Sequence, residues 1–211
     1  MNENATKRNG LLSKKLIKAL ESRNMECYYA ESREAALQKA LELIPEGSSV
    51  TWGGSMSVNE IGLTKALHEG NYEVYDRNLC KTEEEKKALT LKAFDCDYYL
   101  SSANALSEDG IIVNIDGNAN RVAAIAYGPR NVVMIVGMNK VVRTEADAMS
   151  RAKYIAAPIN AQRFGQAPCT TTGDCVHCKS PACICCQTLV TRFSREKGRI
   201  KVILVNDDLG Y

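Results

Sequence analysis

Short apolar strand patterns alternate with amphipathic helix patterns along most of the chain, and this alternation restricts the fold more than any other feature. The expected strands cover residues 26–30, 48–52, 72–75, 97–101, 111–115, 122–126, 132–136 and 199–205. The expected helices lie within residues 1–24, 32–44, 58–69, 82–94 and 144–157. Because alternating strands and helices form largely parallel sheets, the sequence predicts an α/β fold with helices on both faces of the sheet.

Residues 103–137 interrupt this alternation. Two clusters rich in turn-forming residues, 106–110 and 116–120, separate the apolar runs, and Asp-Gly between apolar runs is a strong hairpin signal. We therefore expect an antiparallel excursion in which 111–115 and 122–126 are strands. The next run, 132–136, is apolar without a break, which is typical of a buried central strand.

Composition limits the classes of protein to which the chain can belong. With 211 residues, 45% of them hydrophobic, one domain over residues 1–211 is expected. A net charge of +2, with no basic stripe interleaved with aromatic residues, argues against a nucleic-acid partner. We find no apolar run long enough for a bilayer and no secretory signal, so the expected location is the cytoplasm, away from the membrane.

Six of the nine cysteines lie within an expected loop insertion, residues 168–187, before the last strand. In a reducing compartment such crowding favours a metal over disulfides. Cys175 and Cys178 are spaced to bind one metal from a single turn, and His177 between them could replace a thiolate. The spacing permits zinc or an iron–sulfur cluster and matches no standard pattern of either. The alternative is a set of thiols that only pack.

Several polar or glycine-rich positions follow expected strands, and ligands of open parallel sheets lie beyond the carboxyl ends of strands. The Gly-Gly-Ser turn at 53–55 offers backbone amides to an anion, although it could be a tight turn alone. The guanidinium of Arg121 suits carboxylate or phosphate, while its Asn and Asp neighbours are also ordinary turn formers. The expected ligand-binding residues of one cleft are Gly53, Gly54, Ser55, Asn104, Asp116, Asn120, Arg121 and Lys140.

Glu60 is the candidate catalytic residue. Ser57 and Glu60 have the spacing of a capping box, which is a structural role. A carboxylate beside the Gly-Gly-Ser turn could instead act as a base or a nucleophile. Both roles are compatible, because a glutamate in the first turn still lies near the mouth of its helix.

These motifs together resemble the LUD-domain family, the group similar to lactate utilization protein C. The matching stretches are residues 51–62, 101–110, 114–122, 127–129, 136–141, 156–158, 175–181 and 198–205. The resemblance covers nearly the whole chain from about residue 10. It implies the three-layer α/β architecture of the superfamily of glucosamine-phosphate isomerase, ribose-phosphate isomerase and CoA-transferase.

The same resemblance implies a function in the use of L-lactate or a related organic acid, with a small anion in the strand-end cleft and a metal centre on the Cys-rich tail. Two alternatives stay open. One is an accessory subunit of an electron-transfer complex without catalysis of its own; the other is an enzyme like the phosphosugar isomerases or CoA-transferases. The expected partners are a small anionic molecule, iron–sulfur or flavin proteins, and a second copy of the chain in a homodimer.

The cysteine tail departs from the family pattern. The family usually reads Ser-Pro-Asp-Arg-Ile-Cys where this chain reads Ser-Pro-Ala-Cys-Ile-Cys, so Cys185 matches the family cysteine, Cys183 replaces an arginine and Cys186 is additional. The metal ligands implied by the resemblance are Cys169, Cys175, Cys178 and Cys185. The lactate-oxidation context of the family favours an iron–sulfur cluster over zinc.

Overall fold

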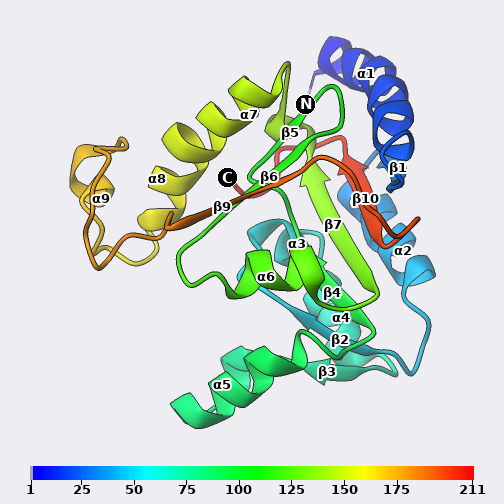
Figure 1. Ribbon diagram of the computed structural model, residues 1–211. Helices are drawn as coiled ribbons and strands as arrows, with labels where there is room; N and C mark the ends of the chain where they lie inside the picture. Colours follow the sequence, from blue (N-terminus) through cyan, green and yellow to red (C-terminus); the bar gives the residue numbers. More distant parts are fainter. Residues whose placement is uncertain (1) are drawn as a thin grey trace.

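A six-stranded parallel sheet forms the centre of the computed structural model, which describes residues 2–211 (Figure 1). Its strand order is β1-β10-β7-β4-β2-β3, and every neighbouring pair is parallel. The strands are β1 (Glu26–Ala30), β2 (Ser49–Trp52), β3 (Glu73–Tyr75), β4 (Tyr98–Ser101), β7 (Asn131–Gly137) and β10 (Ile200–Val205). The fold confirms the mostly parallel α/β sheet expected from the sequence.

Alternation within the central strands explains why helices cover both faces. In β7, Val132 and Met134 belong to one apolar core, and Val133 and Ile135 belong to the other. Helices α1 (Glu3–Glu21) and α6 (Asn120–Tyr127) contribute to the first core. Helices α2 (Arg33–Leu43), α3 (Met56–Glu60) and α4 (Leu63–Glu69) contribute to the second. The result is a three-layer arrangement of helices, sheet and helices. A further helix, α5 (Glu83–Lys92), follows the short turn η1 (Arg77–Leu79).

A second, mixed sheet is the expected antiparallel excursion. Its order is β8-β5-β6-β9, with β6 antiparallel to both β5 and β9. Its strands are β5 (Ala105–Ser107), β6 (Ile112–Asp116), β8 (Val141–Val142) and β9 (Gln187–Thr191). Helix α7 (Glu145–Arg151) and the π-turn η3 (Ala152–Ala156) pack on it, and α8 (Ala157–Ala161) follows them in the chain. The short helix α9 (Cys169–Thr172) lies beyond α8, at one side of the molecule (Figure 1).

The prediction of a strand at 122–126 is wrong, because these residues lie in helix α6. Ala119 adopts a φ of 64° and turns the chain after β6. The Asp116 carboxylate then accepts hydrogen bonds from the amides of Arg121 and Val122, at 2.8 and 3.1 Å, and holds the first turn. Alanines, which favour helix, fill much of the segment, so the local contacts and the propensity agree.

Two further expectations about local structure are wrong. The predicted helix at 58–69 is divided into α3 and α4 at Gly62, whose φ is 79°. The N-cap of α3 is Ser55, whose hydroxyl accepts from the amide of Val58, so Ser57 and Glu60 do not form the expected capping box. Residues 187–191, for which the sequence predicted no strand, form the edge strand β9. Among the helices of residues 2–211, none is both long and apolar enough to cross a membrane.

Candidate functional site

Two adjoining cavities lie where β2, β4 and β7 end. The inner cavity, of about 40 Å³, is lined by the predicted residues Gly54, Ser55, Asn104, Arg121 and Lys140. The outer cleft, of about 500 Å³, is lined by the predicted residues Gly53, Gly54, Asp116, Asn120 and Arg121. The structure therefore brings all eight predicted residues to one edge of the sheet. Gly54 and Arg121 border both cavities, so the two hollows form one connected region.

The Gly-Gly turn lies among guanidinium groups. A Cβ at Gly53 would lie 2.9 Å from the Tyr99 hydroxyl and 3.2 Å from Cδ of Arg121, so a side chain there would displace its neighbours. A Cβ at Gly54 would instead meet Arg77 at 3.6 Å and Arg163 at 3.9 Å. Nη1 of Arg163 also donates to the Gly54 carbonyl at 3.3 Å. The outer cleft is therefore a positively charged space into which the turn projects no side chain.

Two buried polar atoms in this region have no hydrogen-bond partner within residues 2–211: Nε of Arg121 and Oδ1 of Asn114. Both residues line the inner cavity. Asn114 is 1% exposed, and its Nδ2 donates to the Ser102 carbonyl at 2.8 Å, which fixes the amide and leaves the oxygen unused. Because unpaired buried polar atoms are costly, one donor and one acceptor beside the inner cavity lack the partners that buried groups usually have. Sequence reasoning missed Asn114, which lies inside a strand that reads as apolar core.

Lys140 is 4% exposed and lies behind two serines. Its Nζ is 3.0 Å from Oγ of Ser57 and 3.0 Å from Oγ of Ser102, and within residues 2–211 it forms no ion pair with a carboxylate. Burial, aided by the charge of Arg151, lowers the pKa of Lys140 from 10.5 to about 7, although Glu60 acts in the opposite direction. The sequence indicated Lys140 as an anion contact and assigned Ser57 only to a helix cap.

Other predicted residues have their side chains engaged by the fold. Oδ2 of Asp116 accepts from the first amides of α6, as described above. Oδ1 of Asn104 accepts from the amide of Ile115 at 2.8 Å. Oε2 of Glu60, which is half-buried, accepts from the amide of Gly210 at 2.8 Å, and Glu60 is not among the residues that line either cavity of the described chain. A catalytic role for Glu60 stays a prediction.

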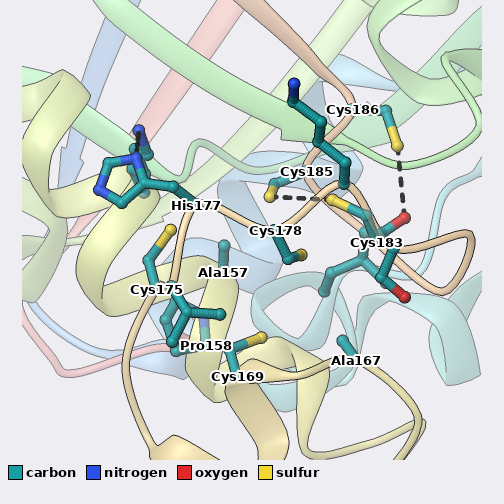
Figure 2. A pocket seen from close by; sticks show the side chains of 15 residues that line it. Ala157, Pro158, Ala167, Cys169, Cys175, His177, Cys178, Cys183, Cys185 and Cys186 are labelled. Carbon is teal, nitrogen blue, oxygen red and sulfur yellow. Dashed lines mark hydrogen bonds between the residues drawn. The ribbon is translucent and has the colours of Figure 1, made fainter.

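All six clustered cysteines line a separate cavity of about 500 Å³ beside α8 and α9 (Figure 2). The four cysteines implied as ligands, Cys169, Cys175, Cys178 and Cys185, are among them. The Sγ atoms of Cys183 and Cys185 are 3.3 Å apart. The ring nitrogens of His177 instead contact Lys153 at 3.0 Å and Tyr154 at 3.3 Å. No three Cys, His, Asp or Glu side chains in residues 2–211 are arranged to hold a metal ion.

The thiols of this cavity influence one another's ionisation. Burial opposes ionisation of Cys183, but the Cys185 backbone and the neighbouring thiols of Cys185, Cys186 and Cys178 stabilise its thiolate, so the pKa of Cys183 is lowered. Burial, followed by the hydrogen bond and the charge of Cys183, raises the pKa of Cys185 to about 12. A single thiolate is therefore stabilised by its neighbours, whereas a second negative charge in the same cavity is disfavoured.

The protein is thus of the three-layer α/β class, with a strand-end cleft of positive charge and a thiol-lined cavity next to it. The pattern of the LUD domain matches residues 13–205, and the chain belongs to this family. The fold is similar to that of a duf162 family protein from Deinococcus radiodurans, at 12% identity and a TM-score of 0.55, over 93% of this chain and 97% of that one.

A weaker similarity links the chain to ribose 5-phosphate isomerase A from Methanocaldococcus jannaschii. The identity is 14% and the TM-score 0.37, over 67% of this chain and 66% of the isomerase. A search of curated proteins gave no match. Family membership supports a function of the lactate-utilization type at the level of the family.

Proposed function

We propose that this LUD-domain protein acts in the utilization of L-lactate or a closely related 2-hydroxy acid, which it binds in the inner cavity. The observation that carries the proposal is the pair of unpaired buried atoms, Nε of Arg121 and Oδ1 of Asn114. A 2-hydroxy acid has a carboxylate that accepts from a guanidinium and a hydroxyl that donates to an amide oxygen. One such molecule would therefore give a hydrogen-bond partner to each of these two atoms.

The charge of the cleft supports an anion. Arg121 lines both the inner cavity and the outer cleft, and Arg77 and Arg163 line the outer cleft. In residues 2–211, Asp116 is the one carboxylate side chain that lines either space, and the start of α6 already uses it. Cations that outnumber the carboxylates of a partly enclosed site attract an anionic ligand.

The proposal includes a metal centre in the thiol-lined cavity. The residue types of this cavity suit such a centre, because thiolates are the ligands of iron–sulfur clusters and of structural zinc, although no three of the side chains in residues 2–211 are arranged around a metal ion. Cys169, Cys175, Cys178 and Cys185 would hold the group, with Cys183 close to Cys185 as a substitute. An iron–sulfur cluster would supply one-electron transfer to iron–sulfur or flavin partner proteins. The proposal places the chain in the cytoplasm, where thiols stay reduced, and includes assembly as a homodimer.

Isothermal titration calorimetry tests the anion site. We expect L-lactate to bind more tightly than propionate, which has the same carboxylate but no hydroxyl for Asn114. Gly54→Val should weaken binding at least tenfold, because its side chain would enter the space between Arg77 and Arg163 at the mouth of the inner cavity. Gly10→Val is the matched control, since a Cβ at Gly10 meets nothing within 4 Å and lies in α1, away from the cleft.

Three outcomes of this titration contradict the proposal. One is equal affinity for L-lactate and propionate, which would remove the role of Asn114. Another is unchanged affinity in a folded Gly54→Val variant. The third is tighter binding of inorganic phosphate than of L-lactate, which would favour a phosphorylated substrate and the isomerase alternative. The metal centre is tested separately, by metal analysis and absorption spectroscopy of protein purified without oxygen, and protein without iron and zinc would contradict it.

A further inference from the structure

Ser57, Ser102 and Lys140 form a hydrogen-bonded cluster at one wall of the inner cavity. Nζ of Lys140 contacts both hydroxyls at 3.0 Å, and the two hydroxyls are 3.4 Å apart. Each residue comes from a different segment: Ser57 lies in α3, Ser102 directly follows β4, and Lys140 lies in the turn η2 (Met138–Lys140) after β7. The anion site proposed above gives no role to the contacts between the Lys140 amine and these two serines.

We propose that Ser102 is a nucleophile activated by Lys140, and that the inner cavity catalyses acyl transfer from an ester or thioester of a short-chain acid to water. Ser102 is partly exposed to the cavity, whereas Ser57 is 1% exposed. Ser57 is a positioning residue, because its hydroxyl contacts both Nζ of Lys140 and Oγ of Ser102. Pairs of serine and lysine recur as a variant of the serine–histidine arrangement on unrelated folds.

The reaction balances without any oxidant or reductant. The neutral amine of Lys140 takes the proton of Ser102 Oγ as this oxygen bonds to the acyl carbon. The bond to the leaving alcohol or thiol then breaks, and the leaving group takes the proton from Lys140. Water attacks the acyl-serine ester, and Lys140 again accepts a proton and returns it to Ser102 Oγ as the C–O bond breaks. The products are the free acid and the alcohol or thiol.

The surroundings of Lys140 favour the neutral amine that this chemistry needs. Arg151 of α7 and Arg121 of α6 repel a charge on Nζ, and Glu60 of α3 attracts one. Burial dominates, and the pKa of Lys140 falls to about 7. At pH 8 most of the amine is therefore available as a base, whereas an exposed lysine would remain protonated.

The size and charge of the site define the acyl group. A cavity of about 40 Å³ admits only a small acyl group, and the outer cleft of about 500 Å³ can accept a larger leaving group. The free acid that leaves Ser102 is formed beside Arg121 and Asn114, which line the same cavity. The inferred substrates are thus esters or thioesters of small 2-hydroxy acids, and this choice of acid rests on the proposed function.

A fluorophosphonate tests the nucleophile directly. This uncharged probe forms a bond from Ser Oγ to phosphorus and releases fluoride, and it distinguishes an activated serine from the nine cysteines. We expect one label per chain, mapped to Ser102 by peptide mass spectrometry. The labelling rate should rise with pH and reach half its maximum near pH 7, where Lys140 loses its proton. Turnover of a lactoyl thioester, beyond one equivalent per chain, should follow the same profile.

Variants separate the roles of the three residues. Ser102→Ala should abolish the label, and Lys140→Met should slow labelling about 100-fold or more, as expected for loss of a general base. Ser57→Ala should slow it and move the pH midpoint downward, because the ammonium loses one acceptor; a purely structural serine would change thermal stability and leave the midpoint unchanged. Ser22→Ala, an exposed serine at the end of α1, is the matched control and should label as the unmodified chain does.

Two results overturn the inference: no label on Ser102 across pH 6 to 9, or a labelling rate that does not depend on pH in that range. The pH dependence is measured on the unmodified chain, so it can refute the proposal even if the Lys140→Met variant does not fold. The two proposals also fail separately. Calorimetry with L-lactate measures the anion site without bond formation, and fluorophosphonate labelling measures the serine without an anion.

Discussion

Replacing Lys140 with methionine should stabilise the protein relative to the unmodified chain at low pH, and this advantage should shrink as the pH rises. The pKa of this lysine is 10.5 in the unfolded chain and about 7 in the fold. Below pH 7 both states carry the proton, and folding must bury the charge at a cost of about 5 kcal/mol, which a methionine does not incur. Between pH 7 and 10.5 the unfolded state binds more protons, so the stability of the unmodified chain rises with pH.

The magnitude can be measured as a difference between two chains. Urea unfolding of the unmodified protein and of Lys140→Met at pH 6 and pH 9, with a reductant present, gives two differences in free energy of unfolding. Linkage predicts that these differ by about 3 kcal/mol, with the larger advantage of methionine at pH 6. The loss of the hydrogen bonds to Ser57 and Ser102 changes the free-energy difference by the same amount at pH 6 and at pH 9, since the serine hydroxyls do not titrate in this range. A difference that is constant with pH, or of opposite slope, would refute the burial of a titrating amine.

Three more predictions concern single residues. Asp116→Ala should reduce the free energy of unfolding by about 1–2 kcal/mol in urea, because two amides of α6 lose their acceptor, whereas the exposed Asp208→Ala should change it by less than about 0.5 kcal/mol. Glu60→Gln should leave L-lactate affinity within about twofold by calorimetry, since an amide oxygen can still accept from Gly210; a loss of turnover by orders of magnitude would instead make Glu60 catalytic. Cys178→Ser should lower the iron or zinc content of anaerobically purified protein, and undiminished content would exclude Cys178 as a ligand.

Much of the fold could be predicted from the sequence because its determinants are local. Residues 132–136 are apolar on both faces, and they form the middle of the central strand β7. The residues that follow the strands could be predicted to share one cleft, because parallel strands bring their carboxyl ends to the same edge of the sheet. The segment 122–126 could not be assigned in this way, because its alanine-rich apolar pattern suits either a strand or a helix. The helix is favoured by the carboxylate of Asp116, six residues before Val122, which accepts a hydrogen bond from the Val122 amide.

The remaining features depend on distances between separate elements. The contacts of Lys140 join residues that are 83 and 38 positions apart, and no spacing in the sequence reveals them. The free oxygen of Asn114 follows from how its amide is fixed, not from its residue type. For the cysteines, the sequence indicated a shared site, and the placement of α8 and α9 determines that all six thiols line one cavity.

A crystal structure of the protein with L-lactate tests the central claim most directly. The account predicts electron density for one molecule in the inner cavity, with its carboxylate on Nε of Arg121 and its hydroxyl on Oδ1 of Asn114. Crystals grown with propionate should show weaker density or none at the same ligand concentration. Density for L-lactate elsewhere, or an inner cavity in which Arg121 and Asn114 contact only protein and water at saturating L-lactate, would contradict the claim.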